Sequence, residues 1–268
     1  MGGSNVMHFE SITCVVEAGL AQLTLNQPER GNPIDGTFAR EFREVAVHLS
    51  NRRDVRAVLL TAKGRFFSVG GDIKAFINDR SALPDIVKAW TADLHSGLSR
   101  FQRMNAPVVT AVHGDVAGGS VSLVAFSDIV LAAETAKFTA AFPMIGFNAD
   151  SGSTLSLSAR MGYSRAKKFL LLAETLTAHQ AEAAGLVDTV TDANSVLDQA
   201  KEIAIRLANG PTQAYGAIKR TMLSARILGL ESQMEEEAQA LAQISATDDA
   251  WEGLTAFAAR RKPAFKGQ

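Results

Sequence analysis

Two glycine clusters are the residues of this sequence best suited to chemistry. The first lies in Val69-Gly70-Gly71-Asp72 and the second in Ala117-Gly118-Gly119-Ser120, and each follows an apolar run. Glycine lets the backbone approach a ligand closely, and an N–H at the start of a helix has no partner within that helix. Two such N–H groups that converge on one oxygen form an oxyanion hole. Glycine pairs after strands also make ordinary tight turns, so the pattern fits both roles.

Several other kinds of catalytic site lack their motifs. The sequence has no His-Glu-x-x-His, no Cys-x-x-Cys and no Gly-x-Ser-x-Gly, and no Gly-x-Gly-x-x-Gly follows a strand. Ser120 stands where a phosphate-binding loop needs its lysine. The histidines lack metal-ligand spacing and are scattered over positions His8, His48, His95, His113 and His179. We therefore expect no metal site, no hydrolase triad and no nicotinamide site.

Charge and composition exclude further classes of protein. The 268 residues carry 27 Lys and Arg against 28 Asp and Glu, which argues against nucleic acid or an anionic membrane as a partner. The single cysteine, Cys14, excludes an intrachain disulfide and fits a reducing compartment. No apolar run reaches the roughly 20 residues of a membrane-spanning helix, and no signal peptide opens the chain. We expect a cytoplasmic enzyme, and we interpret residues 1–7 as an expression remnant or a frayed arm.

The first half of the chain alternates between strands and helices. Apolar patterning predicts a hairpin from Ile12–Val16 and Ala21–Asn26, and then buried strands. The expected buried strands cover 55–62, 107–113 and 128–133. Two sets of apolar residues recur at helical spacing and predict helices. The first set is Phe38, Phe42, Val45 and Leu49, and the second is Ile86, Trp90, Leu94, Leu98 and Phe101. Each glycine cluster thus follows one of these strands.

From Ser151 onward the pattern is helical, with one strand candidate at Val187–Val190. The expected helices cover 151–161, 164–173, 177–184, 195–209, 211–226, 230–246 and 248–261. An all-helical region after an α/β core often packs against a neighbouring subunit, so we expect an oligomer.

Ordered motifs over most of the chain resemble the crotonase superfamily, also called the enoyl-CoA hydratase/isomerase family. They are LNQPERGN (25–32), GRFFSVGGDI (64–73), AVHGDVAGG (111–119), SDIVLA (127–132), AKF (136–138), TAHQAEAAGLV (177–187) and EGLTAF (252–257). The resemblance implies an α/β fold, a crotonase-type spiral of repeated ββα units with a C-terminal all-helical trimerisation region. It divides the chain into a spiral core at 6–200 and a helical oligomerisation region at 201–268, in a homotrimer or homohexamer.

The resemblance also implies the ligand, an acyl-CoA or enoyl-CoA thioester, with coenzyme A arriving as part of the substrate and no other cofactor. The family's two oxyanion N–H groups fall on Gly71 and Gly119. Such donors stabilise the enolate that forms when a proton beside the thioester is removed. Its CoA contacts fall on the backbone near Arg30, on Lys74, and on Phe257 and Arg260 of a neighbouring subunit. Exposed cations are also ordinary surface, and Phe257 with Trp251 and Leu254 also fits an interface core.

The family's acid–base positions divide hydratases from isomerases. The two glutamates of the hydratases fall on Ser122 and Phe142, and neither is a carboxylate. The single aspartate of the enoyl-CoA isomerase subset, which includes the oxepin-forming type of phenylacetate breakdown, falls on Asp150. Ala149 stands where that subset has proline. Asp150 also suits the N-cap of the helix that follows.

The sequence therefore favours a double-bond isomerase with Asp150 as its proton carrier and Gly71 and Gly119 as its oxyanion donors. A second possibility is hydration, or another lyase or hydrolase reaction, with a water placed by polar groups such as Ser122. A third is a non-catalytic scaffold or RNA-binding member of the family. The absence of a clustered basic stripe argues against RNA.

Overall fold

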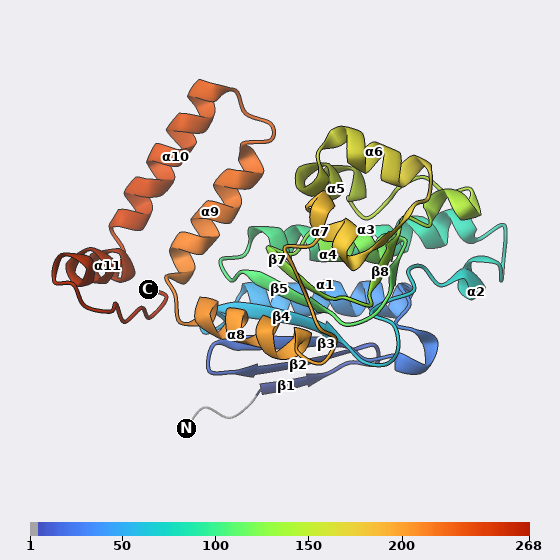
Figure 1. Cartoon of the computed structure of the whole chain (residues 1–268), viewed down its shortest axis with the longest axis horizontal. Helices are drawn as coiled ribbons and strands as arrows, with labels where there is room; N and C mark the ends of the chain where they lie inside the picture. Colours follow the sequence, from blue (N-terminus) through green and yellow to red (C-terminus); the bar gives the residue numbers. More distant parts are fainter. Residues whose placement is uncertain (1–4) are drawn as a thin grey trace.

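A seven-stranded sheet forms the centre of the molecule in the computed structural model, which describes residues 5–268 (Figure 1). The strands β1, β2 and β3 are antiparallel, and from β3 onward each neighbouring pair is parallel. In spatial order they are β1 (Asn5–His8), β2 (Ile12–Glu17), β3 (Leu20–Leu25), β4 (Ala57–Ala62), β5 (Val108–Val112), β7 (Ile129–Ala133) and β10 (Thr189–Thr191). The predicted hairpin and buried strands are confirmed.

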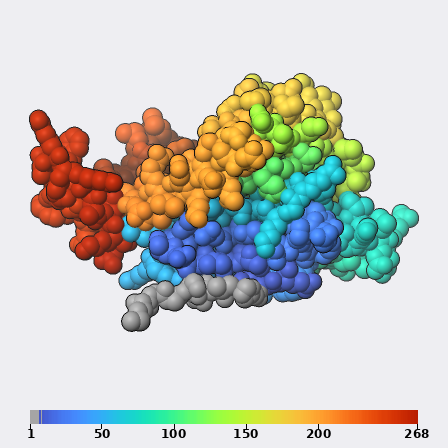
Figure 2. Space-filling model, turned by 60° about the horizontal axis from the view of Figure 1, so that its bottom comes forward, coloured from blue at the N-terminus to red at the C-terminus, as the bar shows by residue number. Residues whose placement is uncertain are grey.

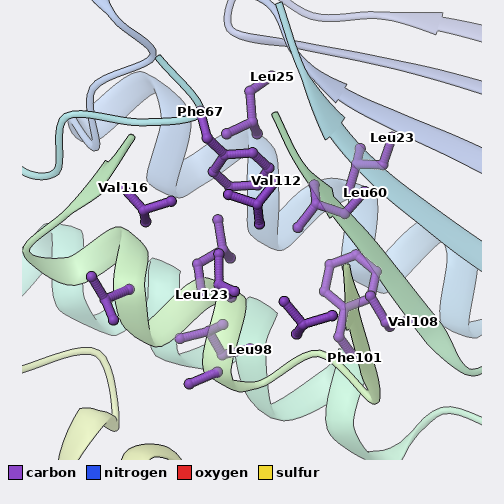
Figure 3. Close-up of a cluster of buried hydrophobic side chains, with 14 of the residues drawn as sticks. Leu23, Leu25, Leu60, Phe67, Leu98, Phe101, Val108, Val112, Val116 and Leu123 are labelled. Carbon is purple, nitrogen blue, oxygen red and sulfur yellow. The ribbon is translucent and has the colours of Figure 1, made fainter. Parts of the chain in front are cut away.

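Helices cover both faces of the sheet, which explains why its central strands are apolar on both sides. The helices α1 (Gly36–Ser50) and α3 (Leu83–Arg103) pack on one face, and α8 (Val196–Ala208) packs on the other. Successive side chains of β4 point to opposite faces of the sheet. Leu60 belongs to the apolar cluster with α1 and α3, and Leu59 belongs to the apolar cluster with α8. Figure 3 shows Leu60 in the larger cluster with Leu98 and Phe101 of α3.

A second, three-stranded sheet lies beside the first and gives the fold its repeating unit. It contains β6 (Val116–Ala117), β8 (Lys137–Thr139) and β9 (Thr175–Thr177). A strand of the large sheet, a strand of the small sheet and a helix recur in that order. The units are β5, β6 and α4 (Gly119–Ala125), then β7, β8 and α5 (Ser153–Met161). This is the ββα repetition that the sequence analysis expected.

The later helices fall into two groups. The helices α6 (Tyr163–Leu171) and α7 (Ala178–Ala184) lie beside α5, whereas α9 (Thr212–Ser224), α10 (Leu230–Ser245) and α11 (Asp248–Ala258) extend from one end of the molecule (Figure 1). Figure 2 shows the C-terminal residues, in red, projecting from one end of the molecule. Within residues 5–268, no helix combines the length and the apolar character needed to cross a bilayer.

The structure differs from the sequence-based expectation at several places, and the short strands β6 and β8 were not expected. Residues 5–8 form β1, paired with β2, so the interpretation of residues 5–7 as an arm is wrong; residues 1–4 lie outside the described part. The strand β9 falls where no strand was expected, because only pairing with β8 defines its three residues. The boundary between 200 and 201 cuts α8, whose buried Ala200 and Ala204 pack on the same sheet face. The core therefore extends to Ala208.

Candidate active site

The small sheet brings the two glycine clusters together. Ser68 and Val116 form a parallel bridge, in which the Ala117 N–H donates to the Ser68 carbonyl at 3.0 Å. The hydroxyl of Ser68 also lies 2.5 Å from that of Ser120, and it donates to the Asn32 carbonyl at 2.6 Å. These contacts hold neighbouring turns of the spiral in a fixed register. Two segments that are nearly fifty residues apart in sequence therefore run side by side.

Among residues 5–268, nothing accepts a hydrogen bond from the backbone N–H of either predicted oxyanion donor. Gly71 forms a parallel bridge with Ile34, but that bridge uses the Gly70 carbonyl at 2.8 Å and the Asp72 N–H at 3.0 Å. The Gly71 N–H therefore points away from Ile34. Gly119 is the first residue of α4, where an N–H has no intrahelical acceptor and the helix end carries partial positive charge. Both groups are available to an anionic oxygen.

Gly71 and Gly119 line one cavity of about 250 Å³, which we call the apolar cavity. Its walls come from α2 (Ile73–Phe76), α3, the start of α4 and the 3-10 helix η2 (Phe142–Ile145) with the turn that follows. Asp150 also lines it, and in the described part of the chain no other carboxylate does. The predicted trio of Gly71, Gly119 and Asp150 thus meets at one site.

Asp150 stands at a tight turn before α5. The next residues, Ser151 and Gly152, both have left-handed backbone with φ of 57° and 65°. The helix N-cap is Gly152, without a side-chain cap, and it is the backbone carbonyl of Asp150 that accepts the Ser153 N–H at 3.0 Å. The alternative prediction, that the Asp150 side chain caps this helix, is therefore wrong. That side chain remains available to the cavity.

Two side chains contact the Asp150 carboxylate, and the sequence analysis missed both. The Ser151 hydroxyl donates to Oδ2 at 3.4 Å. His95 on α3 places Nε2 2.9 Å from Oδ1 of Asp150, and both side chains remain partly exposed. His95 directly follows Leu94 of the predicted apolar stripe, but no motif marks it. Only the packing of α3 against the turn before α5 brings the two residues together.

The two hydratase positions hold no acid in the structure. Ser122 is fully buried in α4, and its hydroxyl donates to the backbone carbonyl of Asp150 at 3.3 Å. It therefore supports the Asp150 turn and is not among the residues that line the apolar cavity. Phe142 does line the cavity, as an apolar side chain.

Three aromatic side chains form one wall of the apolar cavity. The ring centroid of Phe76 lies 5.3 Å from that of Trp90 and 5.7 Å from that of Phe147. Trp90 packs against Gly36, so closely that a Cβ on residue 36 would lie 2.5 Å from Nε1 of Trp90. The sequence placed Trp90 in a helical stripe, but it could not show that Phe76 and Phe147 join it.

The predicted CoA contacts fall in two places. Arg30 forms ion pairs with Asp35 at 2.9 Å and Asp72 at 2.6 Å, and the Lys74 N–H donates to Asp72 at 3.0 Å. Burial disfavours the Arg30 charge, but the two carboxylates outweigh it and raise the pKa of Arg30. Arg30 is thus a fixed cation next to the Gly71 loop.

Phe257 and Arg260 lie far from this loop. Phe257 is 88% exposed on α11, and Arg260 is exposed just beyond the end of that helix. In Figure 1 α11 and α2 stand at opposite ends of the molecule. These two residues cannot reach the apolar cavity of their own chain, so their predicted role depends on a neighbouring subunit.

Comparison with known proteins relates the chain to enoyl-CoA hydratases and isomerases. Residues 16–268 match the family model described as enoyl-CoA hydratase/isomerase. The chain is 35% identical over 266 residues to 1,2-epoxyphenylacetyl-CoA isomerase of Escherichia coli, covering 97% of this chain and 99% of that protein. It is 28% identical over 246 residues to 2,3-dehydroadipyl-CoA hydratase of the same organism, covering 92% and 94%. A crystal structure of enoyl-CoA hydratase from Geobacillus kaustophilus has a TM-score of 0.92 at 26% identity, covering 99% of this chain and 100% of that one.

Proposed function

Since this chain belongs to the enoyl-CoA hydratase/isomerase family, we propose that it shifts a carbon–carbon double bond in an enoyl-CoA thioester. The predicted crotonase-type fold is confirmed by the likeness to solved hydratase structures. The family includes both isomerases and hydratases, so the reaction has to be argued from the site. The observation that carries the proposal is the single carboxylate, Asp150, that lines the apolar cavity with Gly71 and Gly119.

The proposed reaction begins with the thioester oxygen between the N–H groups of Gly71 and Gly119. Asp150 takes a proton from the carbon next to the thioester, and the electron pair of that C–H bond delocalises onto the oxygen. The fixed donors and the N-terminus of α4 stabilise this charge as it forms. Asp150 then returns a proton two carbons away, so that the double bond moves into conjugation with the thioester. Coenzyme A enters with the substrate, and the steps require no other cofactor.

Isomerisation suits this cavity better than hydration. Adding water needs one group to activate the water and another to protonate the α-carbon. The hydratase positions hold the buried Ser122 and the apolar Phe142. One carboxylate that first accepts and then returns a proton is sufficient for an isomerase.

The aromatic wall supports an acyl group that contains a flat ring. Phe76, Trp90 and Phe147 offer ring faces and edges against which a planar group can pack. An apolar cavity of about 150 Å³ already binds benzene. The apolar cavity, at about 250 Å³, has room for a ring and the atoms that join it to the thioester.

The exposed apolar side chains of the C-terminal helices support a trimer-based assembly. Four of these side chains are 58–70% exposed: Ile218 and Met222 on α9, Leu241 on α10 and Trp251 on α11. Large apolar patches that remain exposed mark protein–protein contact surfaces. In such an assembly a neighbour's Phe257 and Arg260 are candidates to contact CoA. Sedimentation at micromolar concentration should show a trimer or hexamer, and a monomer would contradict the assembly.

Replacing Asp150 with asparagine tests the reaction. Asp150→Asn keeps the side-chain size but removes the proton acceptor, so we expect isomerisation of a 3-enoyl-CoA to fall by about 10²–10⁴-fold. Affinity for a saturated acyl-CoA should stay nearly unchanged. Asp198→Asn on the outer face of α8 is the matched control. Near-normal isomerisation by Asp150→Asn, or water addition as the main wild-type reaction, would overturn the proposal.

A further inference from the structure

The Asp150 carboxylate faces the apolar cavity, while its partner His95 lines a different one. This second cavity, of about 270 Å³, is lined by His95, Ser99, Gln102 and Leu155, among others. Ser151 lines both cavities. The hydrogen bond of 2.9 Å between His95 Nε2 and Asp150 Oδ1 therefore joins two cavities through the wall that separates them.

We propose that His95 relays protons between Asp150 and water in the second cavity. This inference rests on the proposed role of Asp150 as the proton carrier. His95 does not line the apolar cavity and so acts only through Asp150, as a positioning and proton-relay residue. Its side chain is 48% exposed, which leaves the imidazole in reach of solvent.

The need for such a route follows from the surroundings of Asp150. The apolar cavity is walled by residues such as Phe76, Trp90 and Phe147, and a bound acyl chain would exclude water from it. Within the described residues the Asp150 carboxylate then contacts only the substrate and the Ser151 hydroxyl on that side. On the other side the second cavity has an apolar part, formed by Leu98, Phe126 and Leu223. It also has a polar part, in which Ser99, Gln102 and Arg103 accompany His95. Water can approach the imidazole there.

The relay balances as a sequence of proton transfers. The substrate C–H bond breaks, its electron pair stays with the carbon, and the proton forms an O–H bond on Asp150. Once Asp150 is protonated, its O–H donates to Nε2 of the His95 tautomer whose Nδ1 carries hydrogen. Transfer of that proton to Nε2 restores the carboxylate and leaves an imidazolium, whose Nε2–H then donates to the carboxylate. The imidazolium releases the Nδ1 proton to water in the second cavity. Reversal of these steps delivers a solvent proton to Asp150 and then to the product carbon.

A relay predicts that solvent hydrogen enters the product. In D₂O we expect the 2-enoyl-CoA formed by the wild type to carry deuterium, measured by mass spectrometry. In His95→Gln the amide can keep a hydrogen bond to Asp150. Unlike imidazole, it cannot accept a proton at one atom and release another proton from a second atom. We expect this variant to lower the deuterium content per turnover by about tenfold or more, because a positioned proton-transfer group contributes on the order of 10²–10⁴-fold. KM should change little, since His95 does not line the apolar cavity.

Two further variants separate a relay from a structural role. Leu155→Trp fills part of the second cavity and leaves His95 in place, so it should lower deuterium content in the same direction. His179→Gln, on the exposed surface of α7, is the matched histidine control and should match the wild type. The relay would be overturned if His95→Gln and Leu155→Trp both gave the same deuterium content per turnover as the wild type.

The relay also has a readout that does not need isomerisation. Exchange of the α-protons of phenylacetyl-CoA in D₂O, followed by NMR, requires only a base at the α-carbon and a route to solvent. If the wild type exchanges these protons but does not isomerise a 3-enoyl-CoA, the proposed function fails while the relay is still tested by His95→Gln. An absence of exchange in the wild type, or unchanged exchange in His95→Gln, would overturn the relay.

Discussion

Gly70 lies against the backbone carbonyl of Ala117, so closely that a Cβ on Gly70 would be 2.7 Å from that oxygen. This contact joins the loop that carries Gly71 to the loop that carries Gly119. It therefore sets the separation of the two proposed oxyanion donors. Gly70 also has a φ of 87°, a backbone conformation that residues with a Cβ rarely adopt.

Gly70→Ala should push the two loops apart and misplace one donor. We expect turnover of an enoyl-CoA to fall by about 10²-fold, comparable to the loss of one oxyanion-hole donor. Gly162→Ala is the control, because Gly162 also has positive φ but nothing lies within 4 Å of its added Cβ. Equal turnover in the two variants would show that the contact with Ala117 does not matter.

Replacing Gly119 separates the role of its N–H from that of its small size. Gly119→Ala and Gly119→Pro both add a Cβ, which would meet Ser151 Oγ at 3.1 Å, but only proline removes the N–H. Proline is tolerated at the first position of a helix, which Gly119 occupies in α4. We expect the proline variant to turn over about 10²–10³-fold more slowly than the alanine variant. Similar rates for the two would argue against Gly119 as a donor.

The aromatic wall should determine which acyl groups bind well. Phe147→Leu removes one ring of the wall without changing the charge of the apolar cavity. We expect it to reduce the preference for phenylacetyl-CoA over hexanoyl-CoA by about two- to tenfold, since an aromatic contact contributes about 0.5–1.5 kcal/mol beyond its buried area. Titration calorimetry with both thioesters measures the ratio. Met144→Leu, at the same cavity, should leave it unchanged.

The thiol of Cys14 should be unreactive and should make stability fall at alkaline pH. Burial raises its pKa from 9.0 to about 11, against the opposing charge of Arg52. Between these values the unfolded chain has lost a proton that the folded chain keeps, so the free energy of unfolding decreases as pH rises. Urea unfolding of the wild type and Cys14→Ala, from about pH 8 to about pH 11, should show a steeper decline of the free energy of unfolding in the wild type. Parallel declines, or rapid labelling of the folded thiol, would contradict this prediction.

The sequence by itself determined the central strands, most of the helices and the family. The spacing of Phe38, Phe42, Val45 and Leu49 predicted the buried face of α1, because a helix repeats every 3.6 residues. The apolar runs predicted the central strands of a sheet covered on both faces. The ordered motifs predicted the crotonase-type fold, and the family comparison confirms it. These features are local in sequence, so each could be read without knowing what packs against it.

Only the tertiary structure decided which distant groups share a site. His95 and Asp150 are 55 residues apart, and their contact depends on how α3 crosses the turn before α5. The aromatic wall likewise joins residues from α2, α3 and the turn after η2. The Asp150 side chain does not cap α5, because Ser151 and Gly152 turn the backbone between Asp150 and the start of that helix. Periodicity fixes which face of a helix is buried, but the packing of separate elements fixes which side chains meet.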